Sequence, residues 1–374
     1  MRRIYKIVVT FAESLPFRIH LIKMIVAEWY AIWRKRKIYQ KVVWTGEQQK
    51  EFDEFWIKNY GRKIPNKWHR LYESMNGTFD IRYFPEIFFT TKFEPMLNPY
   101  NKGVLLQDKS LVELLFNGES NDITFPETYV LCCSGIFYDG RRTVISRSVA
   151  ADLLLNIGAA VIKITIGSSS GKDVKMVNFG IGKIETREQI LQLFNSFGTN
   201  FIVQERIKQH PAISNIYSQS INTFRVMTYI LDGVVLHAPV SMRIGAGGRN
   251  VDNIHSGGIA IGVSDDGILE KYAYRLGYGD TSEKYDKHPD SGILFDQYRI
   301  SFVPKIIKSS HELHGRLPHI GIVSWDFAVN DMDKIVLIEV NLLGQSSWFP
   351  QIICGRSFFG ENTEKVLNKI SKVK

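Results

Sequence analysis

Two apolar segments near the C-terminus constrain the fold more than any other feature of the sequence. They are IVSWDFAVN (322–330) and the stretch 334–341, which ends in IEVN, and they are connected through the turn residues DMDK. A connection this short predicts two antiparallel strands that pair as a hairpin. Alternate residues of a strand share a face, so Glu339 and Asn341 point the same way and pairing places Asp326 opposite them.

Three oxygen-bearing side chains that converge from paired strands predict a metal site. Carboxylate and amide oxygens are ligands of hard cations, so we expect Asp326, Glu339 and Asn341 to hold Mg²⁺ or Mn²⁺ together with phosphate groups. The alternative is that the two carboxylates face solvent as ordinary strand residues. The apolar neighbours of both favour the metal site, because an unpaired buried carboxylate is costly.

The remaining pattern predicts an α+β protein with mostly antiparallel hairpins. Asn, Pro and Gly punctuate the aromatic runs of 76–103, which predicts a linker with short strands and a boundary near residue 100. Ser110 and Glu113 predict a capping box at the start of one helix. The expected strands are 127–133, 160–166, 174–178, 201–205, 223–231, 234–243, 258–263, 320–329 and 334–341. The expected helices are 44–75, 108–118, 147–157, 186–197, 297–313 and 361–372.

A loop of glycine and serine follows the strand VIKITI and predicts phosphate binding. Lys163 lies within that strand and Lys172 ends the loop. Backbone N–H groups of such a loop can bind phosphate oxygens, and a lysine on a strand supplies a fixed positive charge. The alternative is a plain hairpin tip, since the Walker pattern GxxxxGK[ST] before a helix is missing. The loop residues are Gly167, Ser168, Ser169, Ser170 and Gly171.

Two arginines and an asparagine complete the candidate catalytic residues. Arg225 lies on the first strand of a predicted hairpin among apolar neighbours, and Arg243 ends the second strand. Asn253 follows, and then Gly257 and Gly258, where a backbone can approach a ligand closely. ATP-dependent phosphoryl transfer requires carboxylates that bind a metal, lysines that bind phosphate and arginines that stabilise developing charge. The candidate residues supply all three kinds of group.

The basic charge of the chain is concentrated at its N-terminus. Residues 1–41 hold ten Lys and Arg against two Glu, whereas the whole chain has a net charge of +9. Apolar residues recur at helical spacing within 17–41, which predicts a basic amphipathic helix. It either packs on the protein with a solvated cationic end or binds an anionic membrane surface. Nucleic acid is the least favoured partner, because the rest of the chain is nearly neutral.

Several segments in order resemble the ATP-grasp superfamily, and within it the sugar-transfer associated ATP-grasp group. The similarity covers about residues 101–360 and leaves 1–95 outside. No single motif is decisive, but their order is characteristic. The segments are QDKSLVELLFNGESNDITFPETYV, VIKITIGSSSGKDV, FIVQERI, SINTFRVMT, NIHSGGIAIGV, HPDSG and SWDFAV…IEVN.

The resemblance implies a role for most of these residues. Lys109 and Lys163 would contact the phosphates of ATP under a lid formed by 167–171. Gln204, Glu205 and Ile207 would form the hinge strand that meets adenine, chiefly through backbone groups. The arginines would sit at the transferred phosphoryl group, and the three oxygen ligands would hold Mg²⁺.

The sequence departs from the group's pattern at two positions. Ile164 replaces the usual proline after the strand lysine. The acidic residue that contacts ribose is also missing, because no Asp or Glu lies between Arg206 and Phe224. His210, Gln209 or another group would take its place.

The resemblance further implies two α+β lobes that sandwich ATP, with a helical N-terminal extension. We expect the extension and linker at 1–100, the small lobe at 101–203 and the catalytic lobe at 204–374. The implied activity is a ligase that activates a carboxylate as an acyl phosphate and joins it to an amine or amino acid. The acceptor would be a small-molecule or lipid-linked sugar of cell-surface polysaccharide synthesis. The alternatives are a kinase-like sugar phosphotransferase and a non-catalytic nucleotide-binding scaffold.

The cysteine content predicts a reducing compartment. The chain has three cysteines, two of them adjacent, which fit neither a disulfide framework nor a zinc site. We therefore expect a cytoplasmic protein, either free or peripheral to the inner face of the membrane.

Overall fold

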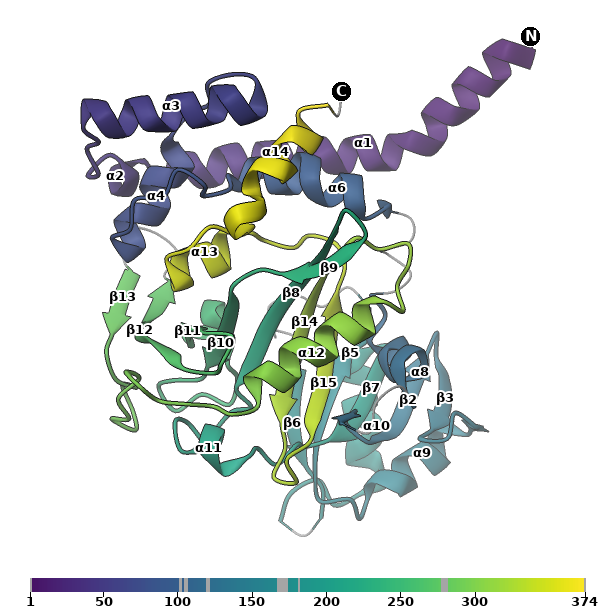
Figure 1. Ribbon diagram of the computed structural model, residues 1–374. Coiled ribbons are helices and arrows are strands. Elements are labelled where there is room, and N and C mark those ends of the chain that lie inside the picture. The colour runs from purple at the N-terminus through teal and green to yellow at the C-terminus, as the bar shows by residue number, and fades with distance from the viewer. Residues whose placement is uncertain are drawn as a thin grey trace.

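The computed structural model describes residues 2–100, 103, 107–118, 122–166, 174–180, 182–276 and 282–372. A larger sheet lies at the centre of Figure 1, a smaller sheet lies at its lower right, and N-terminal helices form a layer along the top. The architecture is the α+β arrangement that the sequence predicts.

The larger sheet is antiparallel except at one edge, where β1 runs parallel to β15. Its order is β1-β15-β14-β8-β10-β11-β12-β13, and β9 pairs with β8 outside this path. Helix α12 (Val303–His314) packs on one face, against β8, β9 and β14. The strands are β1 (Ile123–Thr124), β8 (Thr223–Leu231), β9 (Val234–His237), β10 (Val240–Ile244), β11 (Ile259–Val263), β12 (Leu269–Leu276), β13 (Ser282–Tyr285), β14 (Ile322–Val329) and β15 (Ile335–Asn341).

The smaller sheet is antiparallel throughout, in the order β4-β3-β2-β7-β5-β6. Helices α9 (Arg147–Leu154) and α10 (Arg187–Phe197) pack together with its apolar side chains to form a separate core. Thr186 and Gln189 form a capping box that fixes the start of α10. The strands are β2 (Thr128–Cys133), β3 (Ile136–Asp139), β4 (Val144–Ile145), β5 (Ala159–Ile164), β6 (Val174–Asn178) and β7 (Phe201–Glu205).

Short helices join these elements and end the chain. The expected capping box at Ser110 is wrong, because the side chain of Asp108 caps the first turn by accepting from the Ser110 N–H. The short elements are η2 (Lys109–Leu111), α8 (Val112–Phe116), α11 (Pro211–Ser214), η3 (Ile254–Ser256), α13 (Trp348–Cys354), η4 (Gly360–Asn362) and α14 (Thr363–Ile370).

The N-terminal region is helical almost throughout, which corrects two expectations. The helix expected at 44–75 is two helices, because Gly61 ends the first in a left-handed conformation (φ +86°). The strands expected within 76–103 are instead helical turns whose aromatic side chains enter the core. The elements are α1 (Arg2–Arg34), α2 (Arg36–Tyr39), α3 (Gly46–Tyr60), α4 (Lys67–Asn76), α5 (Glu86–Phe88), the π-helical turn η1 (Phe89–Phe93) and α6 (Glu94–Leu97).

Polar side chains of this N-terminal region hold the backbone that follows β15. The buried carboxylate of Glu86 accepts hydrogen bonds from Ser347 and from the Trp348 N–H, and Glu94 accepts from the Gln345 N–H at 2.9 Å. Asn98 donates to the carbonyls of Ile322 and Leu342. The residues just before β14 and just after β15 are therefore fixed by the N-terminal helices.

Burial of Glu86 predicts a stability that falls as the pH rises. Desolvation and the nearby Glu28 charge raise the pKa of Glu86 to about 8, and its hydrogen bonds offset this only in part. The folded carboxyl therefore keeps its proton over a pH range in which the unfolded one, with the ordinary value of 4.5, has lost it. Stability should fall between about pH 4.5 and about pH 8.

Thermal melts across this pH range test that expectation. Glu86→Gln should melt with a shallower pH dependence than the wild type, although some slope remains because burial also raises the pKa of Glu94 to about 7. Glu51→Gln, at an exposed position of α3, is the matched control and should follow the wild type. Equal slopes for Glu86→Gln and the wild type would contradict the assignment.

Candidate active site

Three charged residues lie in one row across three neighbouring strands. The β14–β15 hairpin that the sequence predicts is confirmed, with Asp326 opposite Glu339 and Ser324 opposite Asn341. On the other side of β14, Asp326 lies opposite Arg225 of β8. Residues directly opposite in antiparallel strands share a face, so all three side chains project to the same side of the sheet. Asn341 lies two residues beyond Glu339 and joins that face.

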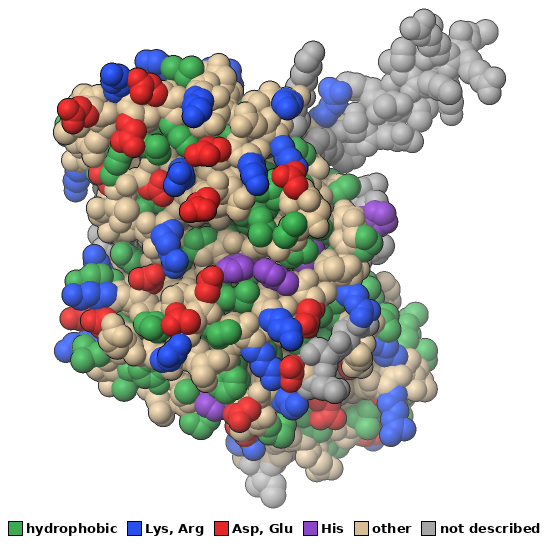
Figure 2. Space-filling model, viewed as in Figure 1, with side chains coloured by type: hydrophobic (Ala, Val, Ile, Leu, Met, Phe, Trp, Pro, Cys, Tyr) green, Lys and Arg blue, Asp and Glu red, His purple; other side chains and the backbone are tan. Residues whose placement is uncertain are grey.

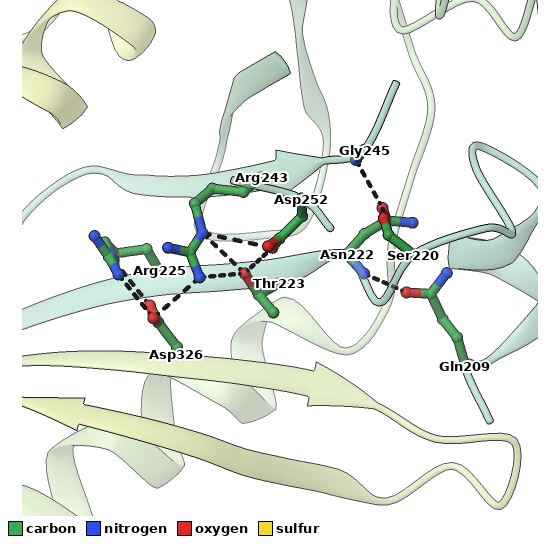
Figure 3. Close-up of polar contacts among 9 residues, drawn as sticks. All are labelled: Gln209, Ser220, Asn222, Thr223, Arg225, Arg243, Gly245, Asp252 and Asp326. Atoms are coloured by element: carbon green, nitrogen blue, oxygen red, sulfur yellow. Dashed lines mark hydrogen bonds and ion pairs between the residues drawn. The ribbon is translucent and has the colours of Figure 1, made fainter. Parts of the chain in front are cut away.

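Asp326 is the centre of a network of charged hydrogen bonds (Figure 3). Arg225 donates to it through two parallel bonds of 2.8 and 2.7 Å, and Arg243 donates through a third of 3.0 Å. The carboxylate is only 1% exposed. Desolvation would raise the pKa of Asp326, but the two guanidinium groups outweigh it and hold the pKa below its usual range. The carboxylate therefore stays charged and fixes both arginines.

Asp252 is a further member of the network, and our sequence analysis did not identify it. It lies 3.5 Å from Arg243 and accepts a hydrogen bond from the Thr223 hydroxyl, which Arg243 also contacts (Figure 3). The only signal in the sequence was its place next to Asn253. Burial disfavours the charge of Arg243, but Asp326 and Asp252 outweigh it and raise the pKa of that guanidinium.

The segment around Asn253 has a structural role in its backbone. The Asn253 carbonyl accepts hydrogen bonds from the N–H groups of Ser256 and Gly258. A side chain at Gly258 would lie 2.5 Å from the Asp252 carbonyl, so glycine is required here by the packing of the chain against itself. We expected Gly257 and Gly258 to let a ligand approach the backbone closely. For Gly258, this contact within the chain already explains why the residue is glycine.

Two lysines line a cleft between the two sheets, and one of them contacts Glu339. Lys109, at the start of η2, lies 3.1 Å from the carboxylate of Glu339. Lys163 of β5 lines the same cleft. The other lining residues are Ser110, Val112, Glu113, Phe125, Pro126, Thr128, Arg142, Ile202, Gln204, Leu337 and Ile338.

Lys163 is a buried cation with an altered proton affinity. Desolvation lowers the pKa of its ammonium group to about 8; the charge of Lys109 adds to this shift, and Glu339 opposes it. The side chains that line the cleft include three cations, Lys109, Lys163 and Arg142, and one carboxylate, Glu113. A small excess of positive charge in a partly enclosed cleft suits an anionic ligand.

The predicted hinge residues are only partly brought to this cleft. Gln204 lines it and donates to the Pro126 carbonyl and the Thr128 hydroxyl. Glu205 and Ile207 are described but are not among the side chains that line it. The Glu205 N–H donates to the Glu127 carbonyl at 2.8 Å.

The side chains of both candidates for the ribose contact already bind other groups of the protein. Gln209 accepts from the Asn222 N–H and donates to the Tyr217 carbonyl. His210 accepts from the Ala212 N–H and lies 3.0 Å from Asp333, a residue of the turn between β14 and β15. The predicted glycine and serine loop at 167–171, together with Lys172, lies outside the described residues.

The donors present fit a hard divalent cation. Asp326, Glu339 and Asn341 supply carboxylate and amide oxygens from one face. The amide nitrogen of Asn341 is buried and makes no hydrogen bond. It could therefore donate one to an oxygen atom of a bound ligand. Among the described residues, no three His, Cys, Asp or Glu side chains are grouped to hold a metal by themselves, so the asparagine would be needed.

Comparison with protein families gives one match that covers most of the chain. A family model described as sugar-transfer associated ATP-grasp matches residues 88–368. No match was found among curated proteins.

Solved structures give distant likenesses. The VanG D-Ala:D-Ser ligase of Enterococcus faecalis is 16% identical, with a TM-score of 0.40 over 71% of this chain and 61% of its own. The L-amino acid ligase of Bacillus licheniformis is 13% identical, with a TM-score of 0.41 over 71% of this chain and 48% of its own. This chain thus spans less than two thirds of either protein, and both likenesses are too distant to assign an activity.

Proposed function

Because this chain belongs to the sugar-transfer associated ATP-grasp family, we propose that it is a Mg-ATP-dependent ligase that joins a carboxylate to an amine. Its two lobes, each a sheet with helices, form the ATP-grasp fold. The observation that supports the proposal is that Lys109 and Lys163 line the cleft between the lobes, while Glu339, on the same strand face as the Asp326 network, lies 3.1 Å from Lys109.

The lysines and the oxygen ligands would bind the nucleotide. Lys109 and Lys163 carry charge toward the cleft and would contact phosphate oxygens. Asp326, Glu339 and Asn341 would hold Mg²⁺, which when bound neutralises charge on the phosphates. Gln204 would border the adenine, with backbone groups of Glu205 and Ile207 as further candidate contacts.

Arg225 and Arg243 would stabilise charge on the transferred phosphoryl group. Both are held rigidly by Asp326, so little reorganisation is needed when charge develops nearby.

The proposed reaction has two steps. A substrate carboxylate oxygen would bond to the γ-phosphorus as ADP leaves, giving an acyl phosphate. An amine would then attack the acyl carbon, lose its proton and release inorganic phosphate, which leaves an amide. Asn253, the residue immediately before η3, remains a candidate for substrate contact.

The pKa of Lys163 predicts how nucleotide affinity depends on pH. Burial lowers it to about 8, so the ammonium loses its charge as the pH rises past that value. Affinity for Mg-ATP should fall by up to about tenfold per pH unit above about pH 8. Titrations at pH 7 and pH 9 would measure it. Lys163→Arg should remove the dependence, and Lys175→Arg, an exposed lysine of β6, should keep it. An affinity of the wild type that does not change with pH would contradict this role.

Product analysis tests the ligase proposal against its alternatives. The protein would be incubated with Mg-ATP, candidate sugar carboxylates and amino acids, and the nucleotide and conjugate identified by mass. ADP, inorganic phosphate and an amide in equal amounts would support the ligase. A stable phosphorylated sugar would instead indicate a phosphotransferase, and an absence of nucleotide turnover with every acceptor would indicate a binding scaffold.

The proposal extends to a biological setting. The family description supports an acceptor that is a small-molecule or lipid-linked sugar of cell-surface polysaccharide synthesis. All three cysteines are free thiols, which supports a cytoplasmic location, at or near the inner face of the membrane.

A further inference from the structure

Helix α1 carries an apolar stripe that the described part of the protein leaves largely exposed. Ile19, Ile22, Val26, Trp29 and Trp33 are each between 55% and 62% exposed, and Tyr30 beside them is 57% exposed. At about 100° per residue these side chains fall within an arc of about 100° on the helix. An exposed stripe this continuous marks a site of interaction.

The opposite face of the same helix already packs on the protein. The rings of His20 and Tyr100 are 5.1 Å apart, and Ile32 is buried in a core cluster. Lys35, just after the helix, lies 5.2 Å from the Trp348 ring. The helix also contacts α5 and η1. Since α1 is attached through this other face, its apolar stripe remains available to a partner outside the chain.

Cationic side chains border the stripe. Arg18 falls at one edge by helical geometry, and Lys23 and Arg34 fall at the other. The guanidinium groups of Arg36 and Arg34 lie 4.3 Å from the Trp33 ring and 5.7 Å from the Tyr30 ring. On the face of the body shown in Figure 2, acidic and basic side chains are interspersed. The apolar stripe of α1 is therefore bordered by positive charge.

We propose that α1 binds the surface of an anionic lipid bilayer, with its apolar stripe inserted among the lipid headgroups. Two tryptophans and a tyrosine suit the boundary between headgroups and acyl chains, and the flanking cations suit anionic lipid phosphate. A second copy of the chain fits less well, because a symmetric pairing of two stripes would bring the flanking cations together. None of the described helices is long and apolar enough to cross a bilayer, so this is attachment at the surface.

Helix α1 belongs to the N-terminal layer of the molecule, where it lies below α3 in the view of Figure 1, and its N-terminal part extends beyond the body. The inference is independent of the proposed ligase activity, because no residue of the stripe belongs to the cleft.

Sedimentation with lipid vesicles tests the proposal. Full-length protein would be mixed with vesicles of phosphatidylcholine alone or with about one third phosphatidylserine. We expect recovery with the anionic vesicles only. Replacing Ile19, Ile22 and Val26 together by serine should lower vesicle affinity about tenfold or more. Replacing Lys23 and Arg34 together by alanine should lower it by about fivefold per charge at low salt.

A matched control separates this surface from general exposure of apolar residues. Val144, Leu294 and Met332 are 64%, 62% and 71% exposed and lie away from α1, so their triple serine variant should bind vesicles like the wild type. Both triple variants should keep the melting temperature and the ATP turnover of the wild type. Equal binding by the Ile19, Ile22 and Val26 variant, or no binding by the wild type, would overturn the proposal. A wild-type dimer that this variant converts to a monomer, without vesicle binding, would assign the stripe to self-association instead.

Discussion

Glu339→Gln is expected to lower ATP turnover by at least about a thousandfold while the protein stays folded. Glutamine has nearly the same shape, so the packing of β15 is kept. The substitution removes one of the charges that would hold Mg²⁺ and deprives Lys109 of the carboxylate 3.1 Å away. ADP release would be measured at increasing Mg²⁺ concentrations, together with a thermal melt.

The control for this variant is Glu283→Gln. Glu283 lies on β13 of the same sheet and pairs with Arg275 at 2.7 Å, but it is not part of the candidate site. We expect turnover within about twofold of the wild type, as for most surface substitutions. Turnover by Glu339→Gln at the wild-type rate would show that the metal assignment is wrong.

Asp326→Ala is expected to lower the free energy of unfolding by about 3–5 kcal/mol. The substitution leaves Arg225 without its bidentate partner and removes one of the two carboxylates that face Arg243. A buried charge without a counter-ion is far more costly than the loss of an exposed ion pair. Urea unfolding would measure the difference, and ATP turnover should be lost as well.

The chain also contains an exposed arginine–aspartate ion pair, which serves as the control for the buried pair of Arg225 and Asp326. Arg187 and Asp152 form the same two parallel hydrogen bonds, at 2.7 and 2.6 Å, but half of the Arg187 side chain is exposed. Asp152→Ala should cost less than about 1 kcal/mol. Combining Asp326→Ala with Arg225→Ala should be less destabilising than the sum of the two single changes. Equal costs for Asp326→Ala and Asp152→Ala would refute the role we give to burial.

The pairing of β14 and β15 as a hairpin could be predicted because its information is local. A short turn limits the partners of each strand, and a period of two then decides which side chains share a face. Asp326 lies opposite Glu339, and not opposite Ile338, because the register shifts by one residue between Asp326 and Phe327, and neither of these two facts predicts that shift. The roles of these residues in metal binding remain predictions, since they depend on a ligand.

The rest of the candidate site and the helices of the N-terminal region could not be predicted, because they depend on contacts between segments that are distant in the sequence. Asp252 belongs to the network only because β8, β10 and β14 are neighbours in the sheet. The aromatic residues of 84–93 favour strands by intrinsic preference, but they are helical here because their side chains pack in a core with α3 and α14. Burial on several sides removes the alternation that distinguishes a strand from a helix.

The hydrogen bonds that Glu86 accepts bear on how this protein can be shortened. The family model begins at residue 88, which suggests a natural place to trim the chain for study. A cut there would remove the acceptor of three hydrogen bonds at the start of α13, along with the Phe84 backbone that pairs with Gln351. The residues that precede the family match are thus part of the scaffold that supports the β14–β15 hairpin.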